Sequence, residues 1–358
     1  MQRLFLLLIL LLPLKSVGVV VVDSTDSKPL GGATLSSADG IILSITDVEG
    51  RAPSPQSFPY DVRCLGYSPL TVEAACDTVR LAPTAIELAG FTVTPGERPI
   101  TLVRAYIREY SSAATSTDTL QLFSEYMADF FLTEKKVKGF STKPQSPKVR
   151  SLARRMRYRN SEGRDTVAND DDAGMLVWVE LTSLEPERHI LGDSLLAGFP
   201  EIRRGEYGTS VVRTFRSPTY TRTLDALATH KDHHWEPWLL KMLGLSVDVT
   251  EMVRSERFLV DEGGEYGPAS LAVSSFSMRM LLKGKWMKKA FHSKEPVALY
   301  STIDIYPVSV RFLTREEALE ERGDKTPLPI VPAPQAPEIP AFVRGWKAVE
   351  QTATPGSL

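Results

Sequence analysis

The sequence predicts a mainly β protein with some α structure, in which an N-terminal antiparallel β-sandwich precedes a strand-rich α+β domain. Short β-branched runs separated by Gly, Pro, Asp and Ser turns fill residues 17–94, which is typical of a small sandwich. Longer apolar segments recur in the second half, and residues 296–312 alternate apolar and polar positions as an amphipathic strand does. A chain of 358 residues is long enough for two domains with separate cores.

The first 18 residues predict an export signal. Arg3 precedes an apolar run from Leu4 to Leu14, which is too short for a bilayer that needs about 20 residues. Ser16 and Gly18 are small residues at the minus-three and minus-one positions for cleavage after Gly18. A retained anchor is the alternative. We therefore expect an exported protein that is periplasmic or associated with the outer membrane.

The sandwich is expected to occupy residues 19–94, and its segments follow a recognisable order. A Val-rich strand ends in Asp-Ser, and the chain continues through Pro-Leu-Gly-Gly-Ala-Thr, Thr-Asp-Val-Glu-Gly, Leu-Gly-Tyr, Leu-Ala-Pro and a final Thr-Val-Thr. This order resembles the carboxypeptidase-like regulatory domain, a prealbumin-like β-sandwich at the front of many exported proteins of Gram-negative bacteria. Residues 51–55, Arg-Ala-Pro-Ser-Pro, depart from the family, which usually has an apolar strand residue there. The resemblance implies a non-catalytic module that carries no peptidase residues.

Two cysteines, Cys64 and Cys76, lie inside the predicted sandwich. In an oxidising compartment such a pair is a candidate for a disulfide. Their offsets from the turn at Gly66 and Tyr67 differ by several residues, so the two side chains need not face each other. Two separately buried thiols are the alternative.

A linker and a helix are expected between residues 95 and 119. Two prolines and a glycine stop the last sandwich strand, and apolar residues then follow at helical spacing, which predicts an amphipathic helix over residues 100–112. The apolar positions are Ile100, Val103, Ile107 and Tyr110.

The strand-rich domain is expected to span residues 120–325 and has no function that its sequence identifies. Thr314 and Glu317 have the spacing of a capping box, so a short helix is expected to begin there. Residues 326–358 are expected to form a Pro-rich disordered tail. Strands are expected at 175–181, 210–215, 220–224, 256–260, 270–282 and 296–312, and short helical pieces at 237–242 and 247–254.

A basic segment within residues 134–164 is the first candidate site. Its functional interpretation is an anion-binding face for phosphate, a polyanionic glycan or lipid headgroups. The alternative is a solvated face, or exposed strands whose outward positions are basic. The net charge of the chain is only -2, and we expect no nucleic-acid partner. The candidate residues are Lys148, Arg150, Arg154, Arg155, Arg157 and Arg159.

A histidine cluster is the second candidate site. Its members, His230, Asp232, His233 and His234, offer imidazole and carboxylate ligands that suit zinc. The adjacent His233 and His234 diverge on either a strand or a helix, whereas His230 and His234 share one helix face. A polar loop or helix start is the preferred alternative, and no cofactor is expected.

Motifs of catalysis do not occur in the sequence. We find no Gly-x-Ser-x-Gly elbow, no P-loop and no dinucleotide-binding glycine pattern after a strand. The expectation is therefore a non-enzymatic, exported cell-envelope protein that binds a glycan or an envelope protein through its sandwich. One alternative is an outer-membrane-associated protein whose C-terminal strands dock to the membrane or to a barrel partner. The other is a metal-dependent hydrolase that uses the histidine cluster.

Overall fold

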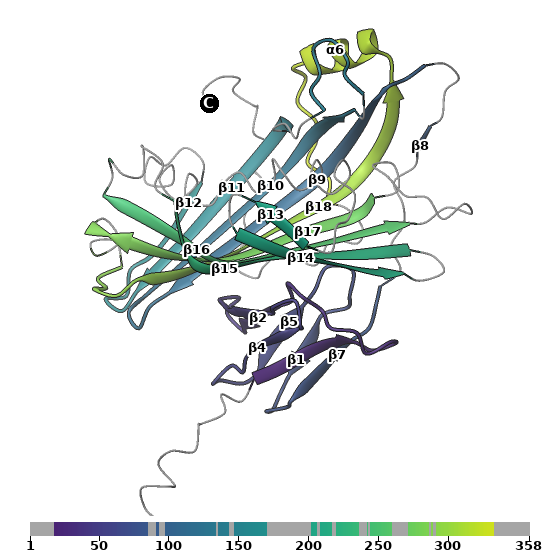
Figure 1. The fold of residues 1–358 in the computed structure, drawn as a ribbon. Helices are drawn as coiled ribbons and strands as arrows, with labels where there is room; N and C mark the ends of the chain where they lie inside the picture. Colours follow the sequence, from purple (N-terminus) through teal and green to yellow (C-terminus); the bar gives the residue numbers. More distant parts are fainter. Residues whose placement is uncertain are drawn as a thin grey trace, which may run out of the picture.

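The computed structural model of the chain describes residues 18–84, 91–92, 97–133, 135–142, 147–169, 202–205, 208–216, 220–235, 242, 244–259, 271–285, 288 and 291–332. Only the backbone is described at residues 166–169, 252, 254 and 259 and at the described positions between 202 and 235. The described chain is mainly β, as the sequence predicts, with a two-sheet sandwich packed beside one large sheet (Figure 1). No helix in these ranges has the length and apolar character of a membrane span.

The sandwich consists of two small sheets around one apolar core. Its residues Val19, Val21, Leu35 and Val62 are fully buried, because alternate positions of short strands point inward. The first and last strands pair in parallel, so the sandwich is not wholly antiparallel. One sheet has the order β4 (Arg51–Pro53), β1 (Gly18–Asp23), β7 (Thr78–Leu81), and the other the order β3 (Ile42–Ile45), β2 (Thr34–Ser37), β5 (Tyr60–Arg63), β6 (Leu70–Val72).

The large sheet is built from two antiparallel meanders that meet where its first strand lies beside its last. Ile107 pairs with Ile305 across this junction. A short strand, β8 (Phe91–Thr92), pairs with the last strand in parallel. The strand order is β12 (Asp165–Asn169), β11 (Lys148–Asn160), β10 (Asp118–Leu132), β9 (Ile100–Ala114), β18 (Val297–Leu313), β17 (Leu271–Gly284), β16 (Leu245–Leu259), β15 (Tyr220–Trp235), β14 (Gly208–Arg216) and β13 (Ile202–Gly205).

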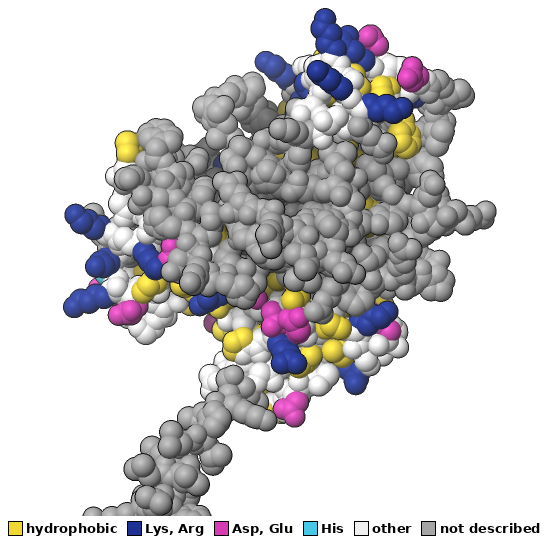
Figure 2. Space-filling view, viewed as in Figure 1, with side chains coloured by type: hydrophobic (Ala, Val, Ile, Leu, Met, Phe, Trp, Pro, Cys, Tyr) yellow, Lys and Arg dark blue, Asp and Glu magenta, His cyan; other side chains and the backbone are white. Residues whose placement is uncertain are grey.

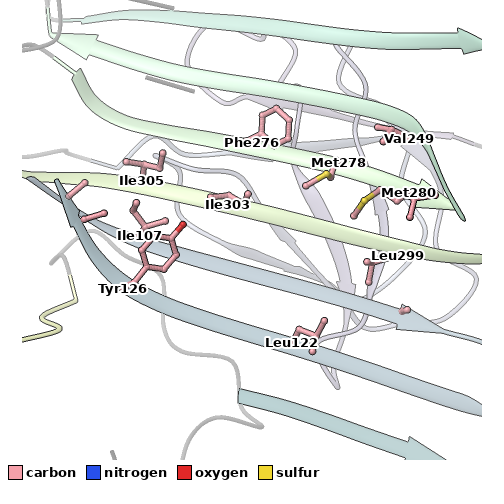
Figure 3. Packing of buried hydrophobic residues seen from close by; sticks show 14 of the residues in the cluster. Ile107, Leu122, Tyr126, Val249, Phe276, Met278, Met280, Leu299, Ile303 and Ile305 are labelled. Carbon is pink, nitrogen blue, oxygen red and sulfur yellow. The ribbon is translucent and has the colours of Figure 1, made fainter. Parts of the chain in front are cut away.

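Both faces of the central strands are buried. Ile107, Tyr126, Phe276 and Ile305 belong to an apolar cluster on one face (Figure 3). The neighbouring Tyr106 is also fully buried, but it belongs to a separate cluster on the opposite face, which the sandwich covers. The helix predicted over residues 100–112 is therefore wrong, because that segment is strand β9. The helical piece predicted at 247–254 is also wrong, since it lies in β16.

The C-terminal part of the described chain follows the prediction at its helix and departs from it afterwards. The strands predicted at 270–282 and 296–312 are β17 and β18. Helix α6 (Arg315–Gly323) begins with the predicted capping box of Thr314 and Glu317. Residues 324–332, here named the strap, lie against the sheet instead of forming a free tail. The predicted signal up to residue 17, the strand at 175–181 and the tail beyond 332 lie outside the described residues.

Candidate functional site

Side chains of the large sheet hold the sandwich by its main chain. The Tyr110 hydroxyl of β9 donates to the carbonyl oxygen of Gly40 at 2.5 Å. Gln121 of β10 donates to the carbonyl oxygen of Asp39 at 2.9 Å and to the Tyr110 hydroxyl at 3.0 Å. Burial raises the pKa of Tyr110, so it remains a donor at neutral pH. The turn at residues 37–41 is thereby fixed to the sheet.

A second contact fixes the other end of the sandwich. Arg257 of β16 donates to the carbonyl oxygen of Gly66 at 2.9 Å, and its guanidinium lies 5.0 Å from the centre of the Tyr67 ring. The Tyr67 hydroxyl in turn donates to Asp23 at 2.8 Å, and Asp23 is buried. Gly66 has a φ of 79°, a left-handed conformation that favours glycine.

Two serines of the sheet add bonds between these ends. Ser112 of β9 accepts a hydrogen bond from the Ile42 amide at 2.8 Å, and Ser277 of β17 donates to the Gly32 carbonyl at 3.2 Å. Like Tyr110 and Gln121, the two serines form hydrogen bonds with main-chain atoms of the sandwich. The sandwich is therefore held in one orientation by contacts at several of its turns.

Titratable side chains gather on the sheet face beneath the sandwich. The Tyr106 hydroxyl donates to Glu125 at 3.0 Å, and Ser275 donates to Asp304 at 2.8 Å. Burial raises the pKa of Asp304, whereas the Ser275 hydrogen bond and the charge of Arg108 act in the opposite direction. The pairs Tyr106–Glu125 and Ser275–Asp304 stabilise the folded chain only while their hydrogen bonds are made.

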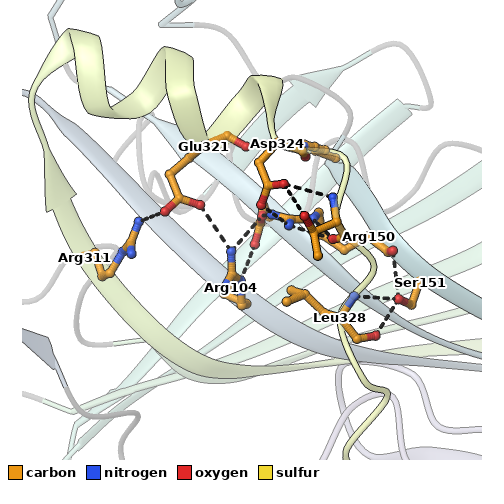
Figure 4. Close-up of polar contacts among 10 residues, drawn as sticks. Arg104, Arg150, Ser151, Arg311, Glu321, Asp324 and Leu328 are labelled. Carbon is orange, nitrogen blue, oxygen red and sulfur yellow. Dashed lines mark hydrogen bonds and ion pairs between the residues drawn. The ribbon is translucent and has the colours of Figure 1, made fainter. Parts of the chain in front are cut away.

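The strap begins at a buried ionic network between β9, β10 and β11 (Figure 4). The fully buried carboxylate of Asp129 accepts from Arg104 at 2.7 and 3.1 Å and from Arg150 at 2.8 Å. Arg150 is itself buried and bonds to Asp324 at 2.6 Å, immediately after α6. Each buried charge in this network has an opposite charge in contact, which offsets its desolvation.

The strap continues along the sheet through main-chain hydrogen bonds. Arg150 donates to the carbonyl oxygen of Thr326 at 3.2 and 2.8 Å. The Ser151 hydroxyl accepts from the Leu328 amide at 2.9 Å and donates to the Leu328 carbonyl at 2.5 Å (Figure 4). Leu328 and Ile330 then pack against an apolar cluster of the sheet, here named the strap groove, which is formed by Tyr106, Met127, Val273 and Tyr306 with Leu65 of the sandwich beside it.

The structure divides the basic residues of β11 among several contacts, and the anion-binding face stays a prediction. Lys148 and Arg150 are directed to the strap, since Lys148 donates to the main-chain oxygens of Glu321 and Asp324. Arg154 stands one strand position from Arg155, so the two residues lie on opposite faces of the sheet. The basic stretch therefore serves several different surfaces of the molecule.

The remaining basic residues of β11 have acidic neighbours. Arg157 forms a two-pronged pair with Asp165, at 2.9 and 2.6 Å, and Arg159 lies 3.9 Å from Asp39 of the sandwich. On the visible face, Lys and Arg side chains collect at the α6 end and at the left-hand edge, with acidic side chains among them (Figure 2). Charge on this face is thus mixed.

A buried carboxylate with an exposed histidine is an arrangement that the sequence did not reveal. Asp118 accepts from Tyr158 and Thr117, each at 2.5 Å, and lies 3.4 Å from the His292 ring. Burial raises the pKa of Asp118, but these hydrogen bonds outweigh it and hold the pKa below its usual value. His292 has a φ of 48° and a side chain that is 58% exposed. No motif could have identified the pair, because 174 residues separate its members.

An open pocket of about 480 Å³ lies between α6 and the end of β18. Arg98 in its wall pairs with Glu317 at 2.6 Å, and Arg311 pairs with Glu321. Because both guanidinium groups already contact carboxylates, the pocket fits an anionic ligand poorly.

The other predicted site residues are placed as follows. Cys64 and Cys76 are half-buried thiols that pack against the sandwich core. His230, Asp232, His233 and His234 belong to strand β15 and not to a loop or helix start, and their side chains lie outside the described residues. No group of three or more metal-ligating side chains occurs among the residues that are described.

Comparison with known proteins gives little. No family model matches the chain, and no curated protein matches it. Among solved structures, one titled "Lipid-protein interactions in lipovitellin" aligns with a TM-score of 0.35 at 9% sequence identity. The alignment covers 60% of this chain and 26% of that chain. A likeness at this level supports no conclusion about fold or function.

Proposed function

We propose that the protein is an exported, non-enzymatic scaffold of the cell envelope, whose sandwich binds a protein or glycan partner. The observation that carries the proposal is the fixed attachment of the sandwich. Side chains from β9, β10, β16 and β17 bond to main-chain atoms of its turns. A module held at several turns presents its outer surface in one orientation, which suits a scaffold better than a flexible linker would.

The outer edge of the sandwich is the surface that we assign to the partner. Strand β6 ends its sheet, so one side of its main chain is a template for an incoming strand. Leu70 on this edge is 43% exposed, and Phe58, two residues before β5, is 39% exposed with its ring 5.4 Å from that of Tyr60. An exposed apolar side chain on an open edge favours a partner contact there.

Export belongs to the same proposal and is supported by the sequence alone. The apolar run that ends at Leu14 is too short for a membrane span, and the sandwich motifs resemble a module of exported Gram-negative proteins. We propose that the mature chain is periplasmic or associated with the outer membrane.

Affinity capture from native envelopes with the mature chain tests the proposal. We expect the wild-type chain to capture a partner and the Leu70→Lys variant to lose it. Val308→Lys, at a position that is 36% exposed on β18, is the matched control and should retain the partner. Metal content is measured on the same sample, and stoichiometric metal would contradict the proposal in favour of a metal-dependent hydrolase.

A further inference from the structure

We propose that the strap groove is a recognition site for an extended, proline-containing peptide of another protein, and that the chain's own residues 326–330 occupy it in the absence of that partner. The proposal goes beyond the scaffold function above, since it assigns a second binding surface and the class of ligand that this surface takes. It concerns a different surface from the β6 edge, so the two can be tested separately.

At Thr326 and Leu328 the polar contacts of the strap are made to its main chain, whereas Arg150 also contacts the Asp324 carboxylate. Arg150 donates a hydrogen bond to the carbonyl of Thr326. Ser151 accepts from the amide of Leu328 and donates to its carbonyl. Arg150 is held rigidly for this contact because its side chain is 2% exposed and is paired with Asp129. Such contacts fit any extended backbone of suitable register, whatever its sequence.

The apolar half of the groove selects alternate side chains. Leu328 and Ile330 pack into it, whereas Pro327 and Pro329 between them are exposed. Tyr106 and Tyr306 lie in its wall with ring centres 6.0 Å apart. Proline at the outward positions stiffens the extended chain and so reduces the entropy lost on binding. The partner motif is therefore apolar–Pro–apolar in an extended conformation.

The chain's own segment is only partly buried against the cluster. Leu328 and Ile330 are only half-buried, and the buried Tyr306 hydroxyl has no hydrogen-bond partner among the described residues. A buried donor without an acceptor is unfavourable, so a peptide whose carbonyl reached this hydroxyl would gain a hydrogen bond that the strap does not make. Displacement of the strap by such a peptide is thus energetically accessible.

Covalent attachment gives the strap an advantage over any free peptide. A segment joined through a short connection competes at an effective concentration on the order of millimolar. A free peptide with an intrinsic dissociation constant below about 100 μM should therefore appear tenfold or more weaker in the intact chain. A chain whose strap is released from the groove should bind the free peptide with its intrinsic, higher affinity.

The test uses the full mature chain and a labelled synthetic peptide with the sequence of residues 324–332. We expect the peptide to bind at least tenfold more tightly to the double variant Leu328→Asp/Ile330→Asp than to the wild type, as measured by fluorescence anisotropy. Val331→Asp is the matched control, because Val331 is 59% exposed in the same segment. It should bind the peptide as weakly as the wild type does.

A second measurement covers the case in which the double variant folds poorly. Excess peptide added to the wild type should speed hydrogen exchange of the Leu328 amide, because displacement breaks its bond to Ser151. Addition of Ser151→Ala to the released variant should weaken peptide binding. An amide that stays protected, or equal affinity for all variants, would overturn the proposal. A dimer that the peptide dissociates would overturn it too, since a second copy would be the occupant.

These outcomes are separable from the proposed function. A chain that captures an envelope partner through Leu70 but ignores the peptide supports the scaffold and rejects the groove. A chain that binds the peptide but captures nothing through Leu70 rejects the assigned β6 surface and leaves the groove supported.

Discussion

Tyr106 of β9 and Tyr306 of β18 lie directly opposite each other in register, at the junction where the first and last strands of the large sheet meet. Their rings are 6.0 Å apart and tilted by 32°, and both are fully buried. Their hydroxyl groups differ, however. Tyr106 donates to Glu125, while the Tyr306 hydroxyl has no hydrogen-bond partner among the described residues.

This difference predicts opposite effects of the same substitution. Tyr106→Phe should lower the free energy of unfolding by about 1–3 kcal/mol, because it leaves the buried Glu125 without its donor. Tyr306→Phe should leave stability unchanged or raise it by up to ~1 kcal/mol, since it removes a buried polar atom that lacks a partner. Urea unfolding of both variants measures the contrast. Equal losses would show that Tyr306 has an acceptor.

The Asp129 network should be the most sensitive ionic contact of the described chain. Asp129→Ala removes the buried carboxylate that Arg104 and Arg150 share and should cost about 3–5 kcal/mol. Asp165→Ala is the matched control: it breaks the exposed pair with Arg157 and should cost only ~0–1 kcal/mol. Thermal or urea unfolding distinguishes the two. A small effect at Asp129 would mean that water replaces the carboxylate.

The shifted carboxyl groups predict a pH effect whose sign can be stated. The pKa of Asp304 is raised by burial above its ordinary value of 3.8, so the unfolded chain releases this proton first as the pH rises. Asp304 therefore favours the folded state below pH 3.8 and loses that contribution as the pH rises through the folded pKa. Asp304→Asn should gain stability relative to the wild type as the pH rises above 3.8.

Asp118→Asn is the control of opposite sign for this experiment. The hydrogen bonds to Asp118 lower its pKa, so its contribution is present above pH 3.8 and disappears as the pH falls through the lower, folded value. The variant should lose stability relative to the wild type at neutral pH. Unfolding curves over a pH series give both trends, and a shared sign would refute the assignment of the two environments.

The sequence predicted local features of the fold and missed features that depend on long-range packing. The capping box of Thr314 and Glu317 is a contact within one helical turn, and it was read correctly. Residues 100–112 were misread because β9 is buried on both faces, with Ala105, Tyr106 and Ile107 all fully inaccessible. Such a strand lacks the apolar–polar alternation, and its apolar residues happen to fall at helical intervals.

The candidate site was less accessible to sequence reasoning for the same reason. Arg150 was visible as one of several basic residues, but its partners Asp324 and Thr326 are more than 170 residues away. The proline-rich composition after residue 325 predicted disorder, whereas Leu328 and Ile330 find a groove made by strands from both meanders. Only the folded sheet brings these groups together.

The attachment of the sandwich can be tested at a glycine. In Gly66→Ala the new methyl group would overlap the Arg257 guanidinium and would also force alanine into a left-handed conformation. Gly163→Ala is matched in backbone, with a φ of 84°, but nothing lies within 4 Å of its new Cβ. The control should lose about 1–2 kcal/mol from the backbone alone. Gly66→Ala should lose a further ~1–3 kcal/mol from overpacking.

Hydrogen exchange at the Ile42 amide, which bonds to Ser112, should accelerate in Gly66→Ala and remain slow in Gly163→Ala. Slow exchange in both variants would mean that the sandwich does not depend on Arg257 for its position.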